Sequence, residues 1–155
     1  MLIKRKVPYF RQEKWFTCGP ACLRMIFAYF GIDVTEKVLE TTCETTELGT
    51  IPTQISTGAA KLGVESIATK NADIEDIRRN LEDRLPVIVL IDPSYIYGGI
   101  AGFGHFIVVL GVEEGEVIYH DPDVSDGEFR RCEIEKFLNA WTISKKWVIV
   151  CKQKY

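Results

Sequence analysis

The segment from Pro20 to Phe30 is long enough to form a helix, and Arg24 is its only charged residue. A helix that is apolar nearly all round is buried inside the protein. Pro20 suits the first turn of a helix, where the missing N–H costs little, and Gly31 is typical of the position just past a helix end. We therefore predict a buried helix from Pro20 to Phe30.

Further helices and strands are predicted from their caps, apolar periodicity and β-branched runs. We expect a second helix that is capped by Asp33 or Thr35 and runs to about Thr42, and three more helices: from Pro52 to Leu62, after the cap Asp73, and from Glu133 to Ala140. Strands are expected at Ile3–Val7, Val64–Ala68, Leu85–Ile91, His105–Val112, Glu116–His120 and Trp147–Lys152. Loops are expected at Glu44–Thr50 and Asp92–Gly104. Helices followed by strands indicate an α+β fold rather than a doubly wound sheet.

Length and composition restrict the class of protein. The 155 residues fit one domain, residues 1–155, and 46% hydrophobic with 26% charged residues is a globular balance. The net charge is −3 and the basic residues are scattered, so the sequence lacks the clustered basic excess that is typical of nucleic-acid-binding proteins. No apolar stretch follows Lys4-Arg5-Lys6 as in a signal peptide, and none is long enough for a membrane helix. We expect a cytoplasmic protein without membrane insertion.

The cysteines do not form a disulfide or metal pattern. Five is an odd number, and the closest pair, Cys18 and Cys22, has no second pair to complete a metal site. Free cysteines are commonly buried, which is the expectation for Cys22, Cys43, Cys132 and Cys151. We therefore expect no metal and no organic cofactor.

Cys18 stands apart because it directly precedes the Gly19-Pro20 start of the buried helix. A thiol is a good nucleophile only as thiolate, and helix N-termini and nearby imidazolium groups favour that form. The alternative is a buried structural cysteine, which position alone favours slightly. A nucleophilic role therefore needs partners elsewhere in the chain.

The chain has two histidines, His105 and His120. His105 opens a strong strand after a glycine-rich loop, where functional side chains often emerge. Asp121 could hold the imidazole in one tautomer, because a hairpin turning at 113–115 places it about opposite Ile107 and near His105. The alternatives are an ordinary core or surface histidine at His120 and a simple turn residue at Asp121.

Acyl transfer also needs hydrogen-bond donors for the developing oxyanion. The backbone N–H of Cys18 can be one donor, and the side chain of Gln12 can be another, although Gln12 alone is an ordinary polar residue. Tyr95 and Tyr97 lie in the loop before His105 and could contact substrate. Exposed loop tyrosines often have no role, and we assign them none.

Three segments resemble the bacteriocin-processing, double-glycine leader peptidases of the papain-like superfamily. They are residues 12–22 (QEKWFTCGPAC), 104–109 (GHFIVV) and 117–122 (VIYHDP). The similarity covers residues 7 to about 150. It implies a papain-like fold, with a helical N-terminal half packed on an antiparallel sheet from the C-terminal half, and it implies catalytic roles for Cys18, His105, Asp121 and Gln12. It assigns no such role to His120.

Familiar members of that family are fused to a membrane-spanning, ATP-driven exporter. This sequence has no membrane helix and no G-x-x-x-x-G-K motif. We therefore expect a stand-alone cysteine peptidase or amidase acting on a peptide or protein substrate. Double-glycine cleavage and a separate exporter remain open, as do two alternatives: an acyltransferase of the same fold, and a non-catalytic peptide-binding module.

Overall fold

A computed structural model describes residues 1–153 of the chain. Its sheet has six antiparallel strands in the order β1-β6-β2-β3-β4-β5. The strands are β1 (Glu65–Thr69), β2 (Val87–Ile91), β3 (His105–Glu113), β4 (Glu116–His120), β5 (Arg130–Glu133) and β6 (Val148–Lys152). The apolar runs at β2 and β3 occupy the centre of the sheet because both of their faces are covered, and nearly every residue in them is buried.

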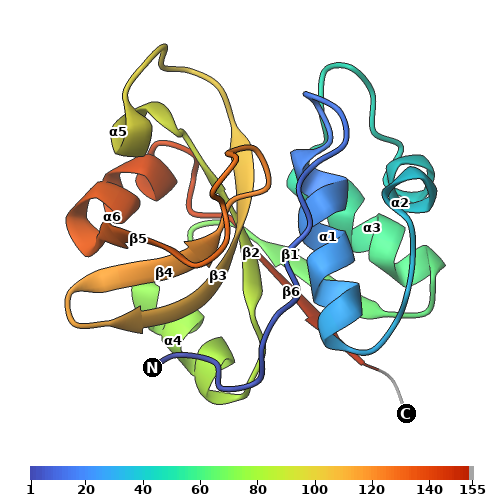
Figure 1. Ribbon diagram of the computed structural model, residues 1–155, viewed down its shortest axis with the longest axis horizontal. Helices are drawn as coiled ribbons and strands as arrows, with labels where there is room; N and C mark the ends of the chain where they lie inside the picture. Colours follow the sequence, from blue (N-terminus) through green and yellow to red (C-terminus); the bar gives the residue numbers. More distant parts are fainter. Residues whose placement is uncertain (154–155) are drawn as a thin grey trace.

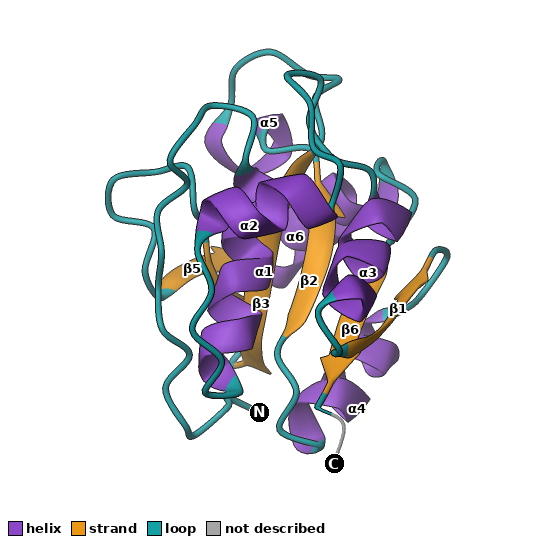
Figure 2. Cartoon of the chain, turned by 90° about the vertical axis from the view of Figure 1, so that its right-hand side faces the viewer, coloured by secondary structure: helices purple, strands orange, loops and turns teal. Residues whose placement is uncertain are grey.

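The helices flank the sheet on two sides (Figure 1). They are α1 (Cys18–Tyr29), α2 (Glu36–Thr42), α3 (Pro52–Lys61), α4 (Ile74–Glu82), α5 (Ser94–Tyr97) and α6 (Ile134–Thr142). In Figure 1, α1, α2 and α3 lie to the right of β2 and β3, whereas α5 and α6 lie to the left; Figure 2 shows the first three in front of the sheet. Helix α1 packs on β3, α3 on β1 and β6, and α6 on β2.

The predicted buried helix is α1, which begins two residues earlier than expected. Leu23, Met25 and Phe27 have no exposed surface. Its one charged residue, Arg24, stays at the edge of the core, with the guanidinium 4.0 Å from the ring centre of Phe10. This rigid, enclosed helix places its N-terminus at the upper end of the molecule in Figure 1, among the loops before α1, after α2 and after α5.

The α+β class is confirmed, with the helices of the N-terminal half packed on an antiparallel sheet that comes mostly from the C-terminal half. Thr35, rather than Asp33, caps α2 by accepting a hydrogen bond from the N–H of Val38. Asp73 caps α4 as predicted and forms a reciprocal pair with Asp76. The predicted domain, residues 1–155, includes Lys154 and Tyr155, which lie outside the described residues.

Two local predictions are wrong, and one strand was not predicted. The strand expected at Ile3–Val7 is absent: the only bridge to β3 nearby joins Leu2 and Gly111, just before this segment, and Ile3 adds a single bond from its N–H to Leu110 O. Helix α5 lies inside the segment predicted as a loop; it is a short turn stabilised by the side chain of Asp92, which leaves no periodic pattern. Strand β5 was missed because its charged residues, such as Arg131, pair with the edge of β4 and show no apolar alternation.

Candidate active site

His105 and Asp121 are in direct contact. His105 is the first residue of β3, and Asp121 follows the last residue of β4. The Nε2 atom of His105 lies 2.7 Å from Oδ1 of Asp121. His105 is 9% exposed and Asp121 is fully buried, so this pair is shielded from water. The contact predicted from the hairpin is therefore present.

Cys18 is the third member of this cluster, since its sulfur is close enough to His105 to raise the pKa of the imidazole. It is the first residue of α1 and is partly exposed, so its sulfur lies at the positive end of the helix. Because Nε2 of His105 is engaged with Asp121, Nδ1 is the nitrogen available to the sulfur. Cys22, one turn further along, is fully buried, and burial raises its pKa well above the ordinary value. The helix thus carries one accessible thiol and one core thiol.

The protonation of His105 depends on these two partners. Burial alone would lower the pKa of the imidazole, but the hydrogen bonds and charges of Asp121 and Cys18 outweigh burial and raise it to about 10. For Asp121, burial would raise the pKa of the carboxyl. Hydrogen bonds from His105, from the Tyr97 hydroxyl and from the N–H of Asp123 hold that pKa below its ordinary value instead. At neutral pH the site therefore holds an imidazolium beside a carboxylate.

The backbone around Asp121 is held by a tight loop. The N–H of Asp121 donates to Gly127 O at 2.8 Å, and the Tyr9 hydroxyl donates to Asp121 O at 2.7 Å. A Cβ atom at Gly127 would lie 1.8 Å from Asp121 O, which no side chain can tolerate. Only glycine at position 127 therefore lets the loop come close enough for its carbonyl oxygen to accept the Asp121 N–H.

Gln12 lies beside the same loop, since its backbone N–H donates to Pro122 O at 2.9 Å. Its side-chain Nε2 donates to the carbonyl oxygens of Lys14 and Trp15, at 3.0 and 3.1 Å. The amide donor proposed for the oxyanion is therefore engaged with its own loop in this structure. The backbone of Gln12 nevertheless lies next to the loop that follows Asp121.

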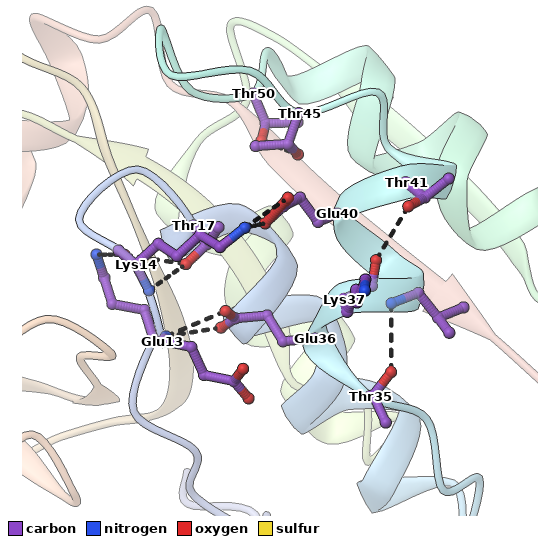
Figure 3. A network of polar contacts seen from close by, with 12 residues as sticks. Glu13, Lys14, Thr17, Thr35, Glu36, Lys37, Glu40, Thr41, Thr45 and Thr50 are labelled. Atoms are coloured by element: carbon purple, nitrogen blue, oxygen red, sulfur yellow. Dashed lines mark hydrogen bonds and ion pairs between the residues drawn. The ribbon is translucent and has the colours of Figure 1, made fainter.

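A buried carboxylate supports the segment between Gln12 and Cys18 (Figure 3). Glu36, at the start of α2, is 2% exposed, and both of its oxygens accept a hydrogen bond from the Glu13 N–H at 3.1 Å. Burial raises the pKa of Glu36, although this bond and one from Thr17 oppose the rise. Thr17 closes the same turn through its hydroxyl, which donates to Lys14 O. Sequence reasoning missed Glu36 because a single acidic residue in a helix normally faces solvent.

Tyr97 was also missed. Its hydroxyl donates to Oδ2 of Asp121 at 2.6 Å. Its place in a glycine-rich loop gave no signal beyond possible contact with substrate. His120, by contrast, is the core histidine considered above: Nε2 lies 2.9 Å from Val7 O, and Nδ1 accepts from the Phe129 N–H at 3.1 Å.

Among residues 1–153, no three histidine, cysteine or acidic side chains are arranged to hold a metal ion. Within the same residues, no helix is both long and apolar enough to cross a membrane.

The fold and the residues at this site define a papain-like domain. Residues 4–149 match the model of the Peptidase_C39 like family. The chain belongs to that family, and the expected relation to double-glycine, bacteriocin-processing peptidases is confirmed.

Individual relatives agree. The chain is 30% identical over 138 residues to the lactococcin-G-processing and transport ATP-binding protein LagD of Lactococcus lactis subsp. lactis; the match covers 89% of this chain and 18% of LagD. The solved peptidase domain of Streptococcus ComA, a bifunctional ABC transporter, superposes with a TM-score of 0.77 at 26% identity, covering 96% of this chain and 100% of that domain. A double glycine motif protease solved with a leader peptide gives 0.76 at 20% identity, covering 99% and 98%.

Proposed function

We propose that the chain is a cysteine peptidase that forms an acyl-enzyme at Cys18. The observation that carries this proposal is the bond between Asp121 and His105, with Cys18 beside that imidazole at a helix N-terminus. A nucleophile, a base and a group that orients the base are the minimum for this chemistry. The buried Cys22 is a built-in comparison, because it shares the helix but has neither the exposure nor the imidazole.

In the first half of the reaction, the sulfur of Cys18 attacks the carbonyl carbon of a peptide bond. A C–S bond forms, and the carbonyl oxygen becomes an oxyanion. The backbone N–H of Cys18 has no acceptor within its own helix and can donate to that oxygen. Gln12 joins as second donor by exchanging one of its loop hydrogen bonds for the substrate. His105 then gives its proton to the leaving amine as the C–N bond breaks.

In the second half, water replaces the amine. His105, now neutral, takes a proton from the water, whose oxygen attacks the thioester carbon. The C–S bond breaks, and the acid product leaves with the protonated His105 and the Cys18 sulfur restored. Asp121 keeps Nδ1 of the imidazole directed at the reacting atoms throughout. These steps require only residues of this chain.

We propose a peptide substrate, and a leader peptide with two glycines before the cleavage site is the first to test. LagD is named for processing and transport, and one solved relative holds a leader peptide. An exporter of the processed peptide would then be the partner of this chain.

The test is digestion of an unbiased peptide library, read by mass spectrometry, with the leader peptide included. The Cys18→Ala variant should lose turnover by at least about 1000-fold, since the nucleophile is removed. Cys132→Ala is the matched control, because Cys132 is a buried thiol on the edge strand β5, and it should cleave within about twofold of wild type. Intact turnover by Cys18→Ala would refute the assignment. A product joined to an added amine would identify an acyltransferase instead.

Alkylation tests the non-catalytic alternative without a substrate. At mildly acidic pH an ordinary thiol reacts slowly, because little thiolate is present. The reference is a small free thiol, since the four other cysteines are buried. Reaction of Cys18 well above the reference supports an enzyme. Reaction at or below the reference rate supports a peptide-binding module.

A further inference from the structure

The two oxygens of the Asp121 carboxylate have separate partners. Oδ1 lies 2.7 Å from Nε2 of His105 and also accepts the Asp123 N–H at 3.0 Å. Oδ2 accepts the hydroxyl of Tyr97 at 2.6 Å. A carboxylate can rotate about its terminal torsion, and contacts on one oxygen alone would leave that rotation weakly restricted. The bond from Tyr97 fixes the second oxygen and therefore the plane of the group.

The direction of the hydrogen bonds around Tyr97 follows from their chemistry. An ionised carboxylate only accepts, so Tyr97 donates its single hydrogen to Asp121. The Tyr119 hydroxyl, 2.8 Å from that of Tyr97, must then donate to Tyr97. The guanidinium carbon of Arg130 lies 5.1 Å from the ring centre of Tyr97. Every donor in this series is thus oriented toward the carboxylate.

The segment that carries Tyr97 is fastened at both ends by Asp92. Oδ1 of Asp92 accepts from the N–H and the hydroxyl of Ser94, at 3.0 and 2.7 Å, and Oδ2 accepts the Gly102 N–H at 2.8 Å. These bonds hold the pKa of Asp92 below its ordinary value. The backbone N–H of Asp92 donates to Ala140 O at 3.0 Å, which joins the segment to α6. Helix α5, at the upper left of Figure 1, is therefore held in the position from which Tyr97 reaches Asp121.

We propose that Tyr97 is a positioning residue for the reaction, and that its hydroxyl holds the Asp121 carboxylate in the orientation that directs His105 at Cys18. This inference rests on the proposed function and deepens it. Loss of the hydroxyl leaves Asp121 freer to rotate and easier to protonate. As the pH falls, Asp121 in such a variant is protonated at a higher pH than in wild type, and the arrangement of His105 and Cys18 is lost at that higher pH.

The groups that face Asp121 and His105 come from several elements. Cys18 on α1 interacts with His105, whereas Tyr97 on α5, Tyr9 in the N-terminal segment and Cys22 on α1 interact with Asp121. Tyr119 on β4 and Arg130 on β5 lie next to Tyr97. Arg130, Cys22 and the tyrosines keep one charge state below about pH 8, since their pKa values are raised further above that range. A shift of the acid limb in this range therefore belongs to the coupled unit of Cys18, His105 and Asp121.

The experiment compares Tyr97→Phe with Tyr95→Phe on a peptide that wild type cleaves. Tyr95 lies on the same short helix, is 43% exposed, and its hydroxyl has no hydrogen bond to any residue of 1–153. Tyr97→Phe should lower kcat about tenfold with KM within about twofold, and should move the acid limb of kcat/KM upward by about one pH unit. Tyr95→Phe should match wild type in all three. An unshifted acid limb in Tyr97→Phe overturns the inference, even if its activity or melting temperature falls.

A second measurement needs no turnover. The imidazole carbons of His105 and His120 are followed by NMR as the pH is varied in wild type and in Tyr97→Phe. The midpoint of His105 should change, whereas that of His120 should not; equal midpoints for His105 in both proteins overturn the inference. If Cys18→Ala still cleaves peptide, the proposed function fails instead, and this titration still decides whether Tyr97 acts on the pair.

Discussion

His105 and Asp121 lie on the same face of the sheet because β3 has one more residue than β4 along their shared ladder. Near the turn, Gly111 pairs with Ile118, but further along Val109 pairs with Tyr119, so that Leu110 forms a bulge. If the pairing of Gly111 with Ile118 continued along the strands without a bulge, Asp121 would lie opposite Val108. Side chains alternate between faces, and a slip of one residue would send Asp121 to the face opposite His105.

Replacement of Asp121 by asparagine should weaken the base. The negative partner of His105 is lost, so the pKa of the imidazole should fall from about 10 toward the ordinary value. We expect kcat to fall at least about tenfold, because the base is less well held in its working tautomer. NMR titration of His105 and steady-state kinetics measure the two effects. Asp123→Asn is the control, since that side chain is exposed, and an unchanged midpoint in Asp121→Asn would contradict the prediction.

Gln12→Ala tests the oxyanion donor. Loss of one donor of this kind costs about 100- to 1000-fold in kcat, and KM should change little. The Nε2 bonds to Lys14 and Trp15 also brace the loop, so thermal unfolding is measured on the same samples. Glu13→Gln, which alters the neighbouring exposed side chain, should retain activity. A loss of stability with kcat unchanged would assign Gln12 a bracing role only.

Glu36 and Glu40 form a matched pair on α2, and both contact the segment before Cys18 (Figure 3). Glu36→Ala removes a buried acceptor of the Glu13 N–H and should destabilise the protein by about 1–3 kcal/mol. Glu40→Ala breaks a surface ion pair with Lys14 and should cost about 0–1 kcal/mol. Urea unfolding measures both changes. Equal losses in the two variants would show that burial of Glu36 adds nothing.

His120 should make the protein less stable as the pH falls. Burial holds the pKa of its imidazole below the ordinary value of about 6.5. A histidine with a lowered pKa stabilises the fold above that ordinary value, and the contribution is lost as the pH decreases below it. The His105 pKa is raised, so its contribution is complete below about 6.5 and is lost only toward pH 10.

Urea unfolding at pH 7, 6 and 5 separates these effects. The free energy of unfolding of wild type should fall over this range more steeply than that of His120→Gln, which is less stable throughout but lacks the titrating group. Parallel pH dependence in the two proteins would show that His120 does not contribute.

The sequence was sufficient for features that depend on local pattern. The apolar run of α1, the β-branched runs of β2 and β3, and the turn of the hairpin each specify an element through its own residues. Asp121 was expected opposite Ile107, and the observed ladder, in which His120 pairs with Val108, extends to that pairing. That expectation assumed a hairpin centred on Glu114. The turn is in fact centred between Glu114 and Gly115, because Glu113 pairs with Glu116. The bulge at Leu110 then shifts the pairing by one residue, which restores the expected register at Asp121.

Contacts between distant segments required the tertiary structure. Tyr97 reaches Asp121 because Asp92 holds α5 in place, and Glu36 supports the turn before Cys18 because α2 packs beside α1. No periodicity, spacing or local propensity in the sequence predicts either contact. The sequence by itself determined which elements form and which thiol begins the buried helix, since short-range sterics and hydrophobic burial decide both. Only the folded chain determined how the Asp121 carboxylate is oriented, because its partners come from segments that meet only after folding.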